Sequence, residues 1–279
     1  MKSHYKKLDS SGALSKVPLV TFMFWIIKIF ATTVGETGGD ALSMTFRLGY
    51  AVSSLIFLGF FLICLLVQVG SKRYYALFYW SLVVGTTTVG TTMSDYFDRT
   101  LGLGYIKSSA ILFCGVIAVL CAWRFIAGRI RFENITSRRD EVFYWMTILV
   151  SNTLGTALGD FTASDTGLGF ERGALVFLGL LALVGLGYFF SKIPKSLLFW
   201  SAYVLTRPLG ATLGDTITKP IAEGGLNLSR VTSSLIIAGL MFATVILYYR
   251  KSGFFPFIRQ NKEGSTFLRS SYETDQKSP

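Results

Sequence analysis

The chain has 279 residues, of which 51% are hydrophobic and only 15% are charged. Soluble proteins carry about 25% charged residues, and the apolar residues here gather in runs long enough to cross a membrane. The net charge of +11 does not indicate a nucleic-acid partner, because the basic residues lie between the apolar runs and in the two tails. The expected partner is the lipid bilayer.

The use of cysteine and histidine excludes several kinds of site. Cys64, Cys114 and Cys121 lie in apolar stretches without a Cys-x-x-Cys pair, so neither a disulfide framework nor a zinc knuckle is expected. His4 is the one histidine of the chain, which excludes imidazole-rich metal sites and histidine-dependent catalysis. We therefore expect no cofactor, no catalytic residues and no enzymatic activity.

Four segments of the chain share one motif, a glycine followed after three residues by glycine or serine and then aspartate. They read T-V-G-E-T-G-G-D (33–40), T-V-G-T-T-M-S-D (88–95), T-L-G-T-A-L-G-D (153–160) and P-L-G-A-T-L-G-D (208–215). A tryptophan that follows Phe or Tyr precedes each first glycine by ten residues: Trp25, Trp80, Trp145 and Trp200. Landmarks at fixed offsets in four copies identify an internal repeat.

Each repeat contains two apolar runs, which predicts an all-α polytopic membrane protein of about eight transmembrane helices in four tandem two-helix repeats. The predicted spans are Val17–Val34, Ala51–Val69, Tyr74–Met93, Ser109–Trp123, Val142–Leu158, Ala174–Phe190, Ser196–Leu213 and Val231–Tyr249. The predicted organisation is an N-terminal tail (1–16), a membrane domain (17–249, with repeats at about 17–70, 74–127, 140–191 and 195–249) and a C-terminal tail (250–279) that is basic and then disordered.

The distribution of basic residues predicts the orientation of these helices. Two helices per repeat place all four aspartate motifs on one side of the membrane. The loops on that side hold six Lys and Arg residues, against 19 on the side of the tails. Because cytoplasmic segments carry the positive excess, both termini are expected in the cytoplasm of a bacterial inner membrane, with the motifs facing the periplasm. The tryptophans would then form an aromatic belt at the cytoplasmic interface.

The small residues of the motif predict close helix packing. Small-x-x-x-small pairs let membrane helices approach each other closely. The glycines concerned are Gly35, Gly39, Gly90, Gly155, Gly159, Gly210 and Gly214, with Ser94 in the remaining place.

The carboxylates of the motif are the candidate metal ligands. An aspartate at the negative end of a helix dipole is unfavourable, and four at one depth would repel one another unless a cation, protons or basic residues relieve them. Carboxylates, threonine hydroxyls and helix-end carbonyls suit hard divalent cations. The predicted ligands are Glu36, Asp40, Asp95, Asp160 and Asp215, and solvated carboxylates spread around the rim are the less favoured alternative.

Two basic residues lie within the predicted helices. Arg207 stands three residues before Gly210, where the other repeats have Thr32, Thr87 and Asn152, and we interpret it as an internal counter-ion for a motif carboxylate. Lys28 stands three residues after Trp25, and for this lysine we expect snorkelling to the cytoplasmic interface.

The passage from Lys16 to Asp40, with its T-T-V-G-E-T-G-G-D segment, resembles the opening of a bacterial family catalogued as uncharacterised membrane-anchored proteins. The resemblance extends to about Tyr249 and implies a multi-pass membrane protein linked to manganese export. The family-like glutamate occurs only in the first repeat, since Thr91, Thr156 and Ala211 replace it in the others. The first repeat is therefore expected to dominate any binding site.

The leading hypothesis is a transporter of a divalent cation, Mn²⁺ or a similar hard ion, since repeats related by an axis along the membrane normal occur in transporters. A four-fold cation channel is an alternative, because T-V-G occurs twice and echoes a potassium filter. A scaffold or sensor without transport is the third possibility. An aspartyl protease is disfavoured, because the four-fold regularity does not suit one asymmetric catalytic pair.

Overall fold

The computed structural model describes residues 16–71, 74–130, 135 and 137–251, and over these residues the protein is all-α. The predicted tails, apart from Lys16, Arg250 and Lys251, lie outside the described residues. The eight long helices are α1 (Phe22–Asp40), α2 (Gly49–Gly70), α3 (Ala76–Asp95), α4 (Gly104–Ala127), α5 (Arg138–Asp160), α6 (Gly169–Phe190), α7 (Lys195–Thr218) and α8 (Arg230–Lys251). The prediction of an all-α fold with eight helices is confirmed.

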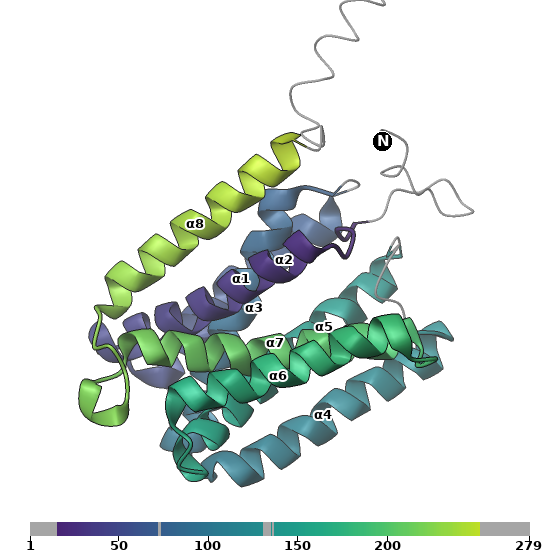
Figure 1. Ribbon diagram of the computed structural model, residues 1–279. Coiled ribbons are helices and arrows are strands. Elements are labelled where there is room, and N and C mark those ends of the chain that lie inside the picture. Colours follow the sequence, from purple (N-terminus) through teal and green to yellow (C-terminus); the bar gives the residue numbers. More distant parts are fainter. Residues whose placement is uncertain (1–15, 72–73, 131–134, 136, 252–279) are drawn as a thin grey trace, which may run out of the picture.

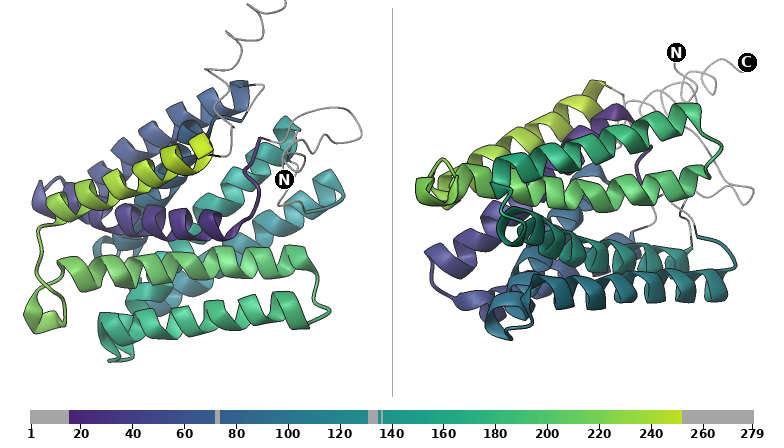
Figure 2. Two further views of the ribbon diagram at one scale, coloured as in Figure 1. Left: turned by 45° about the horizontal axis from the view of Figure 1, so that its top comes forward. Right: turned by 60° about the horizontal axis from the view of Figure 1, so that its bottom comes forward.

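The odd-numbered helices form a closed inner ring, in which α1 contacts α3, α3 contacts α5, α5 contacts α7 and α7 contacts α1. Each even-numbered helix packs outside this ring against the inner helix of the following repeat: α2 on α3, α4 on α5 and α6 on α7. The last helix, α8, returns to α1 and closes the circle, so α8 and α4 lie at opposite margins of the bundle (Figure 1). Figure 2 shows the helices aligned along one direction in a single bundle. Each repeat thus depends on the next one for its packing.

The outer helices have the composition of membrane spans. α2, α4 and α6, together with Arg230–Arg250 of α8, are long and apolar enough to cross a bilayer, and most of their residues face outward. The inner helices have 19 to 24 residues, a similar length, but they carry the threonines, glycines and acids of the motif. The ring hides these polar groups from the lipid. This arrangement indicates a membrane protein.

The inner helices extend further than the apolar runs predicted. α1, α3 and α5 continue through the motif and end at its aspartate, and each is followed by five residues of π-helix: η1 (Ala41–Thr45), η2 (Tyr96–Thr100) and η3 (Phe161–Asp165). α7 instead continues as α-helix to Thr218, where Pro220 excludes a further turn. The predicted spans stopped short because the motif is polar and polar residues are unfavourable in contact with lipid. Inside the ring these residues are shielded from lipid, so the helices continue through the motif.

The predicted aromatic belt of tryptophans is wrong, because Trp80, Trp145 and Trp200 are buried inside the bundle. The aromatic residue before each tryptophan packs against the tryptophan of the next repeat around the ring. The ring-centroid distances are 5.5 Å for Phe24–Trp80, 5.3 Å for Tyr79–Trp145, 5.8 Å for Tyr144–Trp200 and 5.7 Å for Phe199–Trp25. These eight side chains fill one end of the inner ring, which we call the tryptophan end. The opposite end, where the four motif aspartates lie, is the aspartate end.

Candidate functional site

The motif glycines lie where neighbouring inner helices touch. The first glycine of each motif faces the residue that stands three places before the first glycine of the next helix. The pairs are Gly35 with Thr87, Gly90 with Asn152, Gly155 with Arg207 and Gly210 with Thr32. A methyl group at any of these glycines would collide with the neighbour, and at Gly90 it would lie 2.9 Å from the backbone of Asn152. Among the second small residues, Gly39 faces Thr91, Gly159 faces Ala211 and Gly214 faces Glu36.

Residues spaced by four along the inner helices form successive buried layers. Residues i and i+4 of one helix lie on the same face, and here that face points into the ring. Because the four inner helices are equivalent, corresponding residues of the four repeats lie at the same height. From the tryptophan end, the lysine layer is Lys28, Val83, Ile148 and Tyr203; the arginine layer is Thr32, Thr87, Asn152 and Arg207; the glutamate layer is Glu36, Thr91, Thr156 and Ala211; and the aspartate layer is Asp40, Asp95, Asp160 and Asp215. All sixteen are buried.

The expectation that Lys28 snorkels to the membrane interface is wrong, because its side chain is fully buried. Its Nζ donates to Oδ1 of Asn152 across the ring, at 3.4 Å, and lies 4.0 Å from the centre of the Tyr203 ring. The amide of Asn152 in turn donates to Oγ1 of Thr86 at 2.9 Å. Ammonium, amide and ring therefore meet in the middle of the bundle, where the tryptophan end above them leaves no route for a snorkelling chain.

Arg207 reaches into the glutamate layer. Its Nη2 lies 2.9 Å from Oε2 of Glu36, and both side chains are buried. The same nitrogen donates to the hydroxyl of Thr91 on the opposite helix α3, and Nη1 donates to the carbonyl of Thr32 at 3.4 Å. The guanidinium thus ties three inner helices together. The role of Arg207 as a counter-ion during transport stays a prediction. The carboxylate with which Arg207 pairs is that of Glu36.

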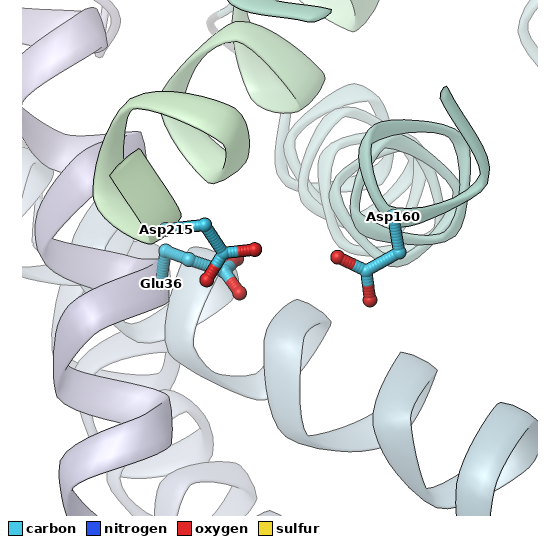
Figure 3. Close-up of side chains that lie close together, drawn as sticks. All are labelled: Glu36, Asp160 and Asp215. Carbon is cyan, nitrogen blue, oxygen red and sulfur yellow. The ribbon is translucent and has the colours of Figure 1, made fainter. Parts of the chain in front are cut away.

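Three of the five predicted metal ligands converge. Carboxylate oxygens of Glu36, Asp160 and Asp215 lie within 4.8 Å of one another, and all three residues are buried. In Figure 3 the carboxyl groups of Glu36 and Asp215 lie side by side, and Asp160 faces them from another helix. Three carboxylates at this separation provide the all-oxygen environment that hard divalent cations prefer. The structure does not place Asp40 and Asp95 in this group.

Two basic residues bridge the aspartate layer, and both lie four residues after an aspartate of the motif. Nε of Arg99 lies 3.1 Å from Asp95, and its Nη2 lies 3.5 Å from Asp160 in the next repeat. A hydroxyl outside the ring also holds this guanidinium, since its Nη1 donates to Tyr50 at 3.1 Å.

The second bridging base repeats this pattern on the other side of the ring. Nζ of Lys219 lies 3.3 Å from Asp215 and 3.1 Å from Asp40 in the first repeat. Burial opposes the charge of Lys219, but the carboxylates of Asp215 and Asp40 outweigh burial and hold its pKa well above the usual value. Lys219 is therefore positively charged at neutral pH. Arg230 at the start of α8 adds a weaker contact, with its Nε 3.6 Å from Asp40.

Sequence reasoning identified the acids and Arg207 but missed the roles of Arg99, Lys219 and Lys28. A signal for the first two was present, because an acid and a base four residues apart lie on one face of a helix. No local signal could have paired Lys28 with Asn152, since 124 residues separate them.

A closed ring of four two-helix repeats, surrounded by apolar helices and enclosing buried acids and bases, defines a polytopic membrane protein with a polar interior. The chain belongs to the family described as Repeat of Unknown Function (DUF347), which matches residues 23–74, 78–128, 143–193 and 198–254. These four matched segments correspond to the four structural repeats. Comparison with curated proteins and with solved structures gives no match.

Proposed function

We propose that the protein transports a divalent cation, Mn²⁺ or a similar hard ion, and binds it between Glu36, Asp160 and Asp215. The observation that carries this proposal is the convergence of three buried carboxylates within 4.8 Å. Buried carboxylates close to one another are costly unless positive charge joins them. One base lies beside each of the three, namely Arg207, Arg99 or Lys219, and a divalent ion would add positive charge at the point where the carboxylates meet. Asp40 and Asp95 complete the aspartate layer and would attract the ion to the site.

The arrangement of the repeats supports a transporter. The site lies at the meeting of helices from both halves of the chain, since Glu36 belongs to α1 whereas Asp160 and Asp215 belong to α5 and α7. Sites at the interface of repeats are typical of transporters that open alternately to the two sides. The packed aromatic side chains of the tryptophan end favour this mode over a continuously open four-fold channel.

The proposed orientation in the membrane follows from the charge distribution of the sequence. With the basic excess in the cytoplasm, the aspartate end faces the periplasm of a bacterial inner membrane. The resemblance noted above favours export of manganese, which would require the ion to enter from the tryptophan end in another conformation.

Cellular metal content under metal challenge tests the proposal. We expect cells that express the native chain to differ in one divalent metal from cells without it, as measured by mass spectrometry. Changing Asp40, Asp95, Asp160 and Asp215 together to Asn should abolish the difference, and Glu36→Gln alone should strongly reduce it. Asp165→Asn is the matched control, because Asp165 is an exposed acid at the same end of the molecule. Equal metal contents in all strains, with all proteins in the membrane, would refute transport of these metals.

A further inference from the structure

The two bridging bases of the aspartate layer have the same ion-pair pattern but differ in exposure. The side chain of Arg99 is 31% exposed, whereas that of Lys219 is 5% exposed. The segment that follows α7 folds back on Lys219. The backbone N–H of Asn227 in this segment donates to the carbonyl of Lys219 at 2.9 Å. Arg99 instead lies at the edge of the ring with Tyr50 as a partner outside it. Moving Arg99 into solvent therefore disrupts far less packing than moving Lys219.

The ion pair that Arg99 makes with the candidate metal site is the longer of its two ion pairs. Its distance to Asp160 is 3.5 Å, compared with 3.1 Å to its own Asp95 and 3.1 Å to Tyr50. Asp160 is the ligand that faces Glu36 and Asp215, so the same carboxylate serves the guanidinium and the proposed ion (Figure 3). An ion that draws the carboxylate of Asp160 toward Glu36 and Asp215 would lengthen its contact with Arg99.

On the basis of the proposed function, we propose that Arg99 is a tethered cation that occupies the aspartate layer when substrate is absent and is displaced when a divalent ion binds. The guanidinium of Arg99 lies between the carboxyl groups of Asp95 and Asp160 and supplies one positive charge to the aspartate layer. A divalent ion between Glu36, Asp160 and Asp215 brings two positive charges to the same region. A monovalent ion carries no more charge than Arg99. Because the guanidinium is covalently attached to the protein, its effective concentration beside the aspartates is high. The exchange therefore selects divalent over monovalent cations.

Binding of Mn²⁺ to the purified full-length protein in detergent, measured by titration calorimetry, tests this inference. Arg99→Gln removes the competing charge and keeps a polar side chain, so we expect Mn²⁺ to bind about tenfold more tightly. Arg99→Lys keeps a tethered charge and should bind like the native protein. Arg172→Gln is the matched control, since Arg172 is an exposed arginine on α6 at the same end of the bundle. Unchanged or weaker binding by Arg99→Gln, with native binding intact, would overturn the inference.

A second measurement uses the native protein and does not depend on the folding of a variant. Phenylglyoxal modifies accessible guanidinium groups, and peptide mass spectrometry reports the extent of modification at each arginine. We expect Mn²⁺ to increase the modification of Arg99 and to leave that of Arg172 unchanged. If native protein binds Mn²⁺ while Arg99 becomes no more reactive, the tethered-cation inference fails and the proposed function stands. If neither the native protein nor any variant binds Mn²⁺, the inference and the proposed Mn²⁺ site both fail.

Discussion

At the residue scale, the interior of the bundle differs from a usual hydrophobic core because it holds charges of both signs. Arg207 is paired with Glu36 at 2.9 Å, whereas Lys28 contacts the amide oxygen of Asn152 and the aromatic ring of Tyr203. Removing one member of a buried ion pair leaves an uncompensated charge, which is more damaging than removing a charge that has no such partner. The two buried bases should therefore respond differently to the same substitution.

We expect Arg207→Met to destabilise the protein by about 3–5 kcal/mol, because it leaves Glu36 buried without its base. Lys28→Met should cost much less, since Asn152 loses one donor but no carboxylate loses a counter-charge. Thermal unfolding of both variants in the same detergent measures the difference. Equal losses in the two variants would contradict this account of the ion pair.

At the element scale, the inner helices approach closely because small residues repeat where they touch. Each first glycine of the motif receives a side chain from the neighbouring helix, so the four contacts are equivalent although the residues inserted differ. The glycines of the outer helices have a different environment. A side chain at Gly59, Gly179 or Gly239 would meet no atom within 4 Å. The motif glycines therefore have a packing function, whereas Gly59, Gly179 and Gly239 have none within the protein.

We expect Gly210→Ala to destabilise the bundle by about 1–3 kcal/mol or more, because the added methyl group collides with the backbone and side chain of Thr32. Gly179→Ala on α6 should be neutral or slightly stabilising, since alanine favours the helix and nothing obstructs it. Thermal unfolding of the two variants under identical conditions gives the comparison. A loss of similar size at Gly179 would mean that helix propensity and lipid contact, rather than helix packing, decide the outcome.

At the scale of the whole molecule, the first four helices and the last four form two halves joined by charge. Five of the seven ion pairs among the described residues link the halves: Lys16–Glu141, Arg99–Asp160, Arg207–Glu36, Lys219–Asp40 and Arg230–Asp40. The bridging bases occur in the second and fourth repeats, so the four-fold repeat has an approximate two-fold pattern of charge. The longer spacing of 65 residues between Asp95 and Asp160, against 55 elsewhere, has the same two-fold pattern.

We expect residues 1–130 and 137–279, expressed together as separate chains, to assemble and co-purify. The contacts of α1 with α7 and α8, and of α3 and α4 with α5, join the halves over a large surface. Either half alone would expose buried charges to lipid and should be degraded or aggregate. Affinity purification through a tag on one half, followed by detection of the other, measures assembly. Stable accumulation of each half without co-purification would show that the halves are independent units.

Much of the fold could be predicted from the sequence because its determinants are local and repeated. Apolar runs fix the helices, the offsets of Trp, Gly and Asp fix the repeat, and a spacing of four places Arg207, Ala211 and Asp215 on one face of α7. The same periodicity identified Glu36 and the four aspartates as a set. These inferences need only the geometry of one helix and the shortage of water in a bilayer.

Only the tertiary structure decided which of these residues meet. It placed each outer helix on the next repeat, turned the tryptophans inward to close one end, and buried Lys28 against Asn152. It also separated Glu36, Asp160 and Asp215 from the other two acids. Some of these contacts join residues more than 100 positions apart, such as Lys28 with Asn152 and Glu36 with Arg207, and they depend on how the ring closes. Local periodicity states which face of a helix is buried, but the identity of the neighbour follows from the packing of all eight helices together.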